Sequence, residues 1–335
     1  MTHFMNAKDD MVTDAIDGVI AASGGTLARL DGYPHIRVVV RSDWDRSKVA
    51  LVSGGGSGHE PAHAGFVGEG MLTAAVCGDI FASPSVDAVL AGILAVTGPA
   101  GCLLIVKNYT GDRLNFGLAA ERARAFGHKV SMVVVDDDIA LPDLPQARGV
   151  AGTLFVHKIA GALAEQGTDL DTVTAAAERV IKSTQSIGMS LDTCTVPGSP
   201  KEDRIPAGMA ELGLGIHGEA GVEQIIYDNA RQAIDAVSGK LESEMPEGQH
   251  VALLNNLGGT SELEMSVLAA ELMKSRIGDR IAFLIGPSAM MTSLAMRGFS
   301  ISVLNVTDGD AALLQVPCPI SAWPGCVELA PETVL

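Results

Sequence analysis

Short apolar runs alternate along the chain with longer stretches in which apolar residues recur every three or four positions. The apolar runs are rich in Val and Ile and predict buried strands at residues 49–52, 102–106 and 130–135. The periodic stretches predict helices at residues 9–23, 85–96, 153–165 and 171–183, with a further helix beginning near Leu114. This alternation favours an α/β fold in which a mostly parallel sheet is flanked by helices. Polar loops that follow such strands are expected along one edge of the sheet.

A change in composition near Cys194 predicts a domain boundary, because a strand-like stretch is followed by polar, proline-rich residues 197–206. We therefore expect two α/β domains, residues 1–194 and residues 195–335, the second smaller and built on a mixed sheet. Its helices are predicted at residues 228–241, 262–275, 287–296 and 309–315, and its strands at residues 251–254, 281–285 and 301–306. Residues 317–335 have no periodicity and predict an extended end or the beginning of a linker.

Charge and cysteine content narrow the classes of function. The 23 Lys and Arg residues against 40 Asp and Glu residues give a net charge of −17, so nucleic acid and anionic membranes are not expected as partners. The chain has 5 cysteines, none in a C-x-x-C pair, and begins without a secretory leader, which predicts a cytoplasmic protein. The uncharged run at residues 88–106 is broken by Thr97-Gly-Pro-Ala-Gly101 and predicts a buried helix, a turn and a strand.

Two histidines are flanked by glycines, which permit positive φ and allow a ligand to approach the main chain. His59 follows a predicted strand in Ser53-Gly-Gly-Gly-Ser-Gly-His-Glu-Pro61, and His217 lies in Gly213-Leu-Gly-Ile-His-Gly-Glu219. We interpret the first segment as a strand leading into a site loop, although a plain strand-to-helix connection also explains its glycines. Lys107 and Asp112 follow the strand at residues 102–106 and complete the candidate set.

Common nucleotide, zinc and serine-nucleophile motifs are missing from the sequence. Gly213, Gly215 and Gly218 match the spacing of a dinucleotide fingerprint, but no clear strand is predicted before them. The triplet Asp136-Asp-Asp138 could supply Mg²⁺ ligands, but a solvated acidic loop is the more common explanation. His157 lies among apolar residues and is expected to be packed or exposed rather than a ligand. With these motifs excluded, the candidate residues are consistent with general acid–base chemistry in which an imidazole can also act as a nucleophile.

Over nearly its whole length the chain resembles the dihydroxyacetone kinases, specifically their substrate-binding K domain. The segments that carry the resemblance are Ser53–Pro61, Lys107-Asn-Tyr-Thr-Gly-Asp-Arg-Leu-Asn-Phe116, Val133-Val-Val-Asp-Asp-Asp138 and Gly213–Glu219. The resemblance implies that His217 adds to the ketone carbon of dihydroxyacetone and holds it as a hemiaminal. It also implies that Gly56, Ser57, Gly58, His59 and Lys107 contact the substrate. Asp112 would accept the proton of the terminal hydroxyl during phosphoryl transfer, and His59 would assist proton movement.

The resemblance places the phosphate donor outside this chain. In the resembled family, ATP and Mg²⁺ sit on a separate L domain or subunit, which uses ATP directly or keeps an ADP that a phosphotransferase system recharges. The sequence of residues 75–85 and 115–121 resembles the fused, ATP-using kinases more than the phosphotransferase-linked ones. No cofactor is expected on this chain itself, and the family implies a homodimer.

Other functions remain compatible with the sequence. A ketone-sensing coactivator could capture the same ligand without transferring phosphate, and a kinase could prefer another short-chain ketose such as erythrulose. A lipid-carrying protein of related fold is a weaker alternative, because a fatty acid requires no nucleophilic histidine at position 217.

Overall fold

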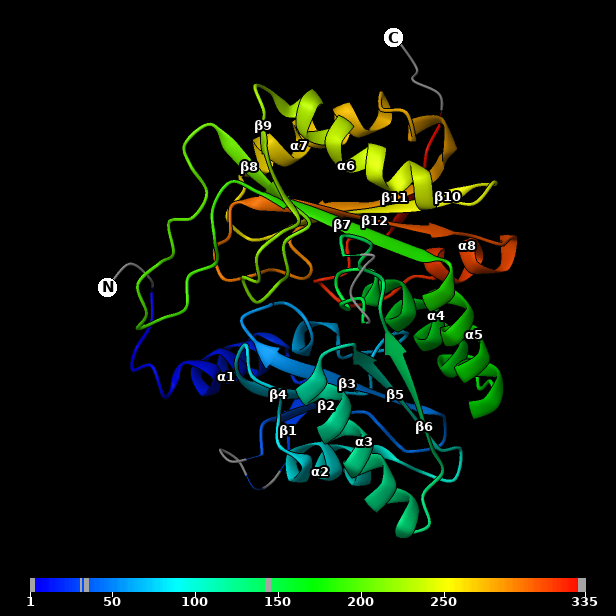
Figure 1. Ribbon diagram of the computed structural model, residues 1–335. Helices are drawn as coiled ribbons and strands as arrows, with labels where there is room; N and C mark the ends of the chain where they lie inside the picture. The colour runs from blue at the N-terminus through cyan, green and yellow to red at the C-terminus, as the bar shows by residue number, and fades with distance from the viewer. Residues whose placement is uncertain (1–3, 31, 33–35, 142–145, 331–335) are drawn as a thin grey trace.

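The computed structural model describes residues 4–30, 32, 36–141 and 146–330. Its secondary structure forms five layers (Figure 1). Helices α2 (Val86–Val96) and α3 (Thr110–Ala125) cover the outer face of one sheet, and α6 (Ala230–Glu244) and α7 (Glu262–Met273) cover the outer face of the other. Between the two sheets lies a helical layer that includes α4 (Thr153–Glu165) and α5 (Leu170–Lys182), and one apolar cluster combines residues of this layer with residues of both sheets. The predicted α/β fold is confirmed.

The helices lie close to their predicted positions. Their bounds are α1 Met11–Ala22, α2 Val86–Val96, α3 Thr110–Ala125, α4 Thr153–Glu165, α5 Leu170–Lys182, α6 Ala230–Glu244, α7 Glu262–Met273 and α8 Asp308–Gln315, with short 3₁₀ turns at Ala64–Phe66 and Gly278–Arg280. Side-chain caps fix several starts: Ser85 accepts from the Ala88 N–H, and Asp169 accepts from the Thr172 N–H. Helix α7 begins with a capping box formed by Ser261 and Glu264.

The first sheet has the strand order β1-β2-β4-β3-β5-β6. Its strands are β1 Leu27–Arg29, β2 Val38–Arg41, β3 Ala50–Ser57, β4 Ala74–Ile80, β5 Cys102–Lys107 and β6 Val130–Val135. Strands β4, β3, β5 and β6 are parallel, and β1 and β2 extend one edge antiparallel. The mostly parallel sheet is as predicted. The carboxyl ends of β3 and β5 meet at one edge, where the chain places His59 and Lys107.

The second sheet has the strand order β13-β11-β10-β12-β7-β8-β9. Its strands are β7 Thr184–Ser190, β8 Met209–Leu212, β9 Glu223–Ile226, β10 His250–Asn256, β11 Ile281–Ser288, β12 Gly298–Asn305 and β13 Cys326–Glu328. Within the described strands of this second sheet, β10 and β11 pair in parallel and all other pairs are antiparallel, so the sheet is mixed, as predicted. Strand β7 precedes residue 194 yet belongs to this sheet; the boundary at residue 194 itself stays a prediction.

Several local predictions were wrong. Residues 289–297 contain no helix; they are held as an irregular segment because the Asn255 side chain accepts from the N–H groups of Met290 and Met291 and donates to the Met291 carbonyl. Helix α3 begins at Thr110 rather than near Leu114. In the described part of the predicted extended end, β13 pairs with β11; residues 331–335 lie outside the described residues. Among the described residues, none of the helices has the length and hydropathy needed to cross a membrane.

Candidate active site at the junction of the two sheets

The glycine run that precedes His59 is a strand and not a loop. Strand β3 continues through Ser57, so the predicted site loop begins only at Gly58. A Cβ atom at Gly54 would lie 2.2 Å from the carbonyl oxygen of Val76 on β4, and one at Gly56 would lie 2.6 Å from the main-chain nitrogen of Ala82. The glycines are therefore needed for close approach of neighbouring backbone.

His59 is completely buried, and its ring is oriented by the second half of the chain. Its Nδ1 lies 2.7 Å from the carbonyl oxygen of Thr292. Because a carbonyl only accepts, Nδ1 carries the proton and Nε2 presents a lone pair. Nε2 is buried and makes no hydrogen bond to a described residue. Burial lowers the pKa of His59 well below its usual value, and the positive charge of Lys107 lowers it further, so the imidazole is neutral.

His217 faces His59 across the junction. Their ring centroids are 4.9 Å apart, and the ring of Tyr109 lies edge-on to His217 at 4.4 Å. The Nδ1 of His217 lies 3.2 Å from Glu219 Oε1, and its main-chain N–H donates to Glu219 Oε2 at 3.0 Å. Burial raises the pKa of Glu219, but its hydrogen bonds with His217 outweigh this effect and lower the value to about 2. The carboxylate therefore accepts from Nδ1–H and leaves the lone pair on Nε2.

Lys107 and Asp112 lie beside the two histidines. A Cβ atom at Gly55 would be 3.4 Å from both Lys107 Nζ and Asp112 Oδ2, and Lys107 Nζ is 5.9 Å from the ring centroid of Tyr109. Both charged side chains are buried, yet Nζ of Lys107 and Oδ1 of Asp112 make no hydrogen bond to a described residue. Burial lowers the pKa of Lys107, and the nearby carboxylate of Asp112 opposes that shift.

Buried polar atoms without partners are rare in proteins and require an explanation. Here four belong to one neighbourhood: Nε2 of His59, Nζ of Lys107, Oδ1 of Asp112 and the hydroxyl oxygen of Tyr109. They surround a glycine-lined surface beside an imidazole lone pair on His217. This arrangement suits a small ligand that has several hydroxyl groups and one electrophilic carbon.

The predicted site residues do not all play the same structural part. His59, Lys107, Asp112 and His217 come together, next to Gly56 on strand β3 and to Gly58 directly after the strand. The hydroxyl of Ser57 is different, because it donates to the carbonyl of Gly78 at 2.8 Å and so supports the fold. Its side chain is buried there.

Sequence reasoning assigned no role to several residues that shape the site. Tyr109 and Glu219 lie inside motifs already singled out, two residues after Lys107 and His217 respectively. Phe81 contacts both histidine rings and has a positive φ of 54°, which a non-glycine residue seldom adopts. Thr292 carries no local signal, because its contribution is a main-chain carbonyl 233 residues from His59.

The acidic triplet has a structural explanation. Asp137 accepts from the N–H groups of Val150 and Gly152 and from the Ser186 hydroxyl, and Asp138 forms an ion pair with Arg148. The described residues include no cluster of three or more metal-ligating side chains. His157 is buried and packed, as expected, with its Nε2 3.1 Å from Nδ1 of His63.

A strand does precede Gly213, although none is predicted there from the sequence, since β8 ends at Leu212. It pairs antiparallel with β7 and β9, and the next element after the glycines is strand β9 rather than a helix. A dinucleotide fingerprint requires a strand followed directly by a helix, so the match in spacing is accidental.

Comparison with known proteins gives consistent matches. The sequence profile of the Dak1 domain matches residues 17–322. The dihydroxyacetone kinase of Citrobacter freundii is 52% identical over 326 residues, covering 96% of this chain and 59% of that protein. The dihydroxyacetone-binding subunit DhaK of a PTS-dependent dihydroxyacetone kinase of Listeria innocua is 43% identical over 341 residues, covering 96% of this chain and 100% of that subunit.

Solved structures agree. The C. freundii kinase, in native form and in complex with AMP-PNP and Mg²⁺, superposes with a TM-score of 0.97 and 50% identity, covering 100% of this chain and 62% or 63% of the solved chain. A dihydroxyacetone kinase operon co-activator, Dha-DhaQ, superposes with a TM-score of 0.87 and 29% identity, covering 93% of this chain and 98% of that protein. The chain thus spans about 60% of the C. freundii kinase and the full length of the Listeria subunit.

Proposed function

This chain belongs to the dihydroxyacetone kinase family as a Dak1 domain, and we propose that it is the dihydroxyacetone-binding component of such a kinase. The observation that carries the proposal is the pairing of His217 with Glu219, which leaves a lone pair on Nε2 beside unpartnered polar atoms. A neutral imidazole is a competent nucleophile near neutral pH. The carbonyl carbon of a small ketone is the electrophile that such a site selects.

Capture of the ketone follows from this geometry. Nε2 of His217 forms a bond to the carbonyl carbon, and the carbonyl π electrons move to the oxygen, which takes a proton from water. Nδ1, held by the Glu219 carboxylate, releases one proton to water in exchange, so the hemiaminal is neutral and Glu219 stays ionised. His59 Nε2 then accepts a hydrogen bond from the new hydroxyl, because its lone pair is free. Glycerol has no electrophilic carbon and cannot form this bond.

Phosphoryl transfer requires a base near the terminal hydroxyl and a donor phosphate. We assign the base to Asp112, whose Oδ1 makes no hydrogen bond to a described residue and whose Oδ2 borders Gly55 together with Nζ of Lys107. Lys107 and the main chain of residues 56–58, at the end of β3 and directly after it, would hold the other hydroxyl groups. The donor, ATP with Mg²⁺ or a phosphotransferase-charged nucleotide, would be held by a separate L domain or subunit.

The assembly and location expected of such a component are also proposals. We infer a homodimer that works with an L-type partner in the cytoplasm. The L-type partner is supported by the Listeria relative, whose name describes a dihydroxyacetone-binding subunit, and by the C. freundii relative, of which this chain covers 59%.

Replacing His217 with Asn tests the capture step. Native mass spectrometry of the wild-type chain with dihydroxyacetone should show an adduct of one ketone per chain that glycerol does not form. The His217→Asn variant should lose the adduct, while His128→Asn, a change outside the site, should keep it. A wild-type chain that binds dihydroxyacetone only without a covalent bond would refute the capture mechanism.

Replacing Asp112 with Asn separates a kinase from a sensor. With an L-type partner, ATP and Mg²⁺, the Asp112→Asn variant should retain capture and lose turnover, whereas the exposed-site control Asp171→Asn should retain both. Erythrulose assayed beside dihydroxyacetone identifies the preferred ketose. Capture without phosphorylation in the wild-type chain, with every donor tested, would instead support the sensor function, for which the structural likeness to Dha-DhaQ is the specific observation.

A further inference from the structure

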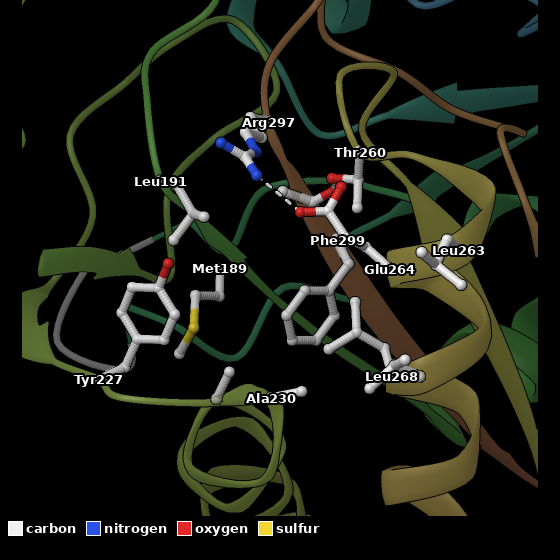
Figure 2. Close-up of a pocket in the computed structure, with 13 residues that line it drawn as sticks. Met189, Leu191, Tyr227, Ala230, Thr260, Leu263, Glu264, Leu268, Arg297 and Phe299 are labelled. Atoms are coloured by element: carbon white, nitrogen blue, oxygen red, sulfur yellow. Dashed lines mark hydrogen bonds and ion pairs between the residues drawn. The ribbon is translucent and has the colours of Figure 1, made fainter. Parts of the chain in front are cut away.

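A second pocket lies on the outer face of the second sheet and shares no residue with the proposed ketone site. It has a volume of about 320 Å³ and is bounded by β7, β12 and the first turns of α6 and α7 (Figure 2). Apolar side chains form most of its wall, including Met189, Leu191, Leu268 and Phe299. Neither the capture of a ketone nor phosphoryl transfer uses this pocket.

The wall leaves apolar surface exposed to solvent. Leu263 and Val267, on α7, are 77% and 46% exposed at the edge of the pocket. Ala230, at the start of α6, is too small to fill the space between α6 and Phe299. Concave sites lined by apolar and aromatic side chains with a few polar groups are the usual form of small-molecule sites.

The volume limits the size of the ligand. An engineered protein cavity of about 150 Å³ lined by apolar side chains binds benzene. The pocket here has about 320 Å³, roughly twice that volume, which corresponds to two fused rings or one ring with a short substituent.

The polar groups at the rim favour a neutral ligand. Arg297 Nη2 is paired with Glu264 Oε1 at 2.7 Å, so the guanidinium charge is already balanced. Thr260 donates its hydroxyl proton to the Gly298 carbonyl at 2.8 Å. Tyr227 differs, because its hydroxyl makes no hydrogen bond to another described residue and can serve a ligand. An anion would meet the Glu264 carboxylate and a chain of net charge −17.

We propose that this pocket binds a small neutral molecule with a fused-ring aromatic body and one hydrogen-bonding group that pairs with the Tyr227 hydroxyl. The apolar body covers Met189 and Phe299, and the polar group lies at the rim. The site is independent of the ketone site, so its ligand is a second ligand of this chain.

Titration of the full chain with indole, followed by calorimetry, tests the proposal. Saturable binding with one site per chain is expected. Ala230→Leu, which fills the pocket, should abolish it, whereas Ala236→Leu, the same change on the same helix outside the pocket, should leave it intact. Tyr227→Phe should weaken indole about threefold to tenfold, the effect of one lost hydrogen bond, and should leave the hydrocarbon indene unaffected.

Three results would overturn the proposal. The first is an absence of saturable binding by either probe, and the second is indole binding that Ala230→Leu does not change. The third is evidence that a second copy of this chain occupies the pocket. In that case sedimentation would show that Ala230→Leu abolishes self-association, and indole would bind more weakly as the protein concentration rises. Each result is independent of kinase activity, so failure here would leave the function proposed for the ketone site untouched.

Discussion

Glu219 selects the tautomer of His217 that carries its lone pair on Nε2. Its carboxylate accepts from Nδ1–H at 3.2 Å and from the His217 main-chain N–H at 3.0 Å, and its pKa of about 2 keeps it ionised across the physiological range. A neutral amide in its place would stabilise neither the loss of the Nδ1 proton nor the positive charge that develops on the ring.

We therefore predict that Glu219→Gln slows ketone capture by His217 about tenfold or more, while the folded structure is kept. Stopped-flow measurement of adduct formation gives the rate, and thermal unfolding reports the stability. Glu223→Gln, on the exposed strand β9, is the matched control and should not change the rate. Unaltered capture in Glu219→Gln would show that another group orients the imidazole.

In the glycine-rich end of strand β3, backbone atoms of neighbouring segments occupy the space that side chains would otherwise fill. Alanine at Gly54 would put Cβ 2.2 Å from the Val76 carbonyl oxygen, so β3 and β4 would have to separate. We expect Gly54→Ala to lower the free energy of unfolding by about 3 kcal/mol and to impair capture. Gly117→Ala, in helix α3 where the new Cβ meets no atom within 4 Å, should raise stability by about 0.5–1 kcal/mol. Chemical denaturation measures both, and equal effects would contradict the strand packing.

Asp137 connects the end of β6 to the start of α4 and to β7. Burial raises its pKa from 3.8 to about 6, although three hydrogen bonds oppose the shift. A raised folded-state pKa means that its stabilising contribution is complete below pH 3.8 and is lost as pH rises through 6.

The difference in unfolding free energy between the wild-type chain and Asp137→Asn should therefore fall by about 2–2.5 kcal/mol between pH 4 and pH 7. Urea denaturation at several pH values gives this difference, with the exposed Asp136→Asn as control. A difference that stays constant, or grows with pH, would show that Asp137 remains ionised in the folded chain.

The sequence predicts those helices and strands that depend on the pattern of residues within one element. It does not predict features that depend on contacts between elements far apart in the chain. The apolar runs predicted β5 and β6, and the helical stripes predicted α1, α2, α4 and α5 within one or two residues. The glycines before His59 were read as a loop, because only the closeness of β4 shows that they belong to a strand. The segment after β11 has a helical pattern, but the Asn255 side chain supplies hydrogen bonds that a helix would otherwise make.

The residues of the candidate site also fall into a group that the sequence indicates and a group that it does not. His59, Lys107, Asp112 and His217 lie in motifs, so the sequence singles them out as candidates, and their roles stay predictions. Thr292 acts through its carbonyl, which every residue has, so no pattern of side chains could reveal it.

At the scale of the whole molecule, Arg148 joins the first sheet to the loop that carries His217. Its Nε donates to Asp138 Oδ2 and its Nη2 to the Gly213 carbonyl oxygen, each at 2.7 Å. The side chains of Arg148 and Asp138 are both buried, so removal of the Arg148 guanidinium leaves the Asp138 carboxylate buried without a compensating charge.

Arg148→Met should lower the free energy of unfolding by about 3–5 kcal/mol and should slow capture, since the loop at Gly213 loses its anchor. The double variant Arg148→Met with Asp138→Asn should recover part of the stability, because no unpaired charge is left, but should not recover the capture rate. Denaturation and adduct kinetics on the same samples test this separation. Recovery of both together would mean that charge burial, and not the anchor, controls the loop.

The hydrogen bond between His59 and the Thr292 carbonyl also fixes an order of events during synthesis. The two residues are 233 positions apart, so His59 leaves the ribosome well before its partner exists. At about 5–20 residues per second the delay is roughly 10 to 50 s. The nascent first half therefore has no oriented imidazole at position 59, and the site proposed at the junction of the two sheets is complete only after Thr292 has been translated.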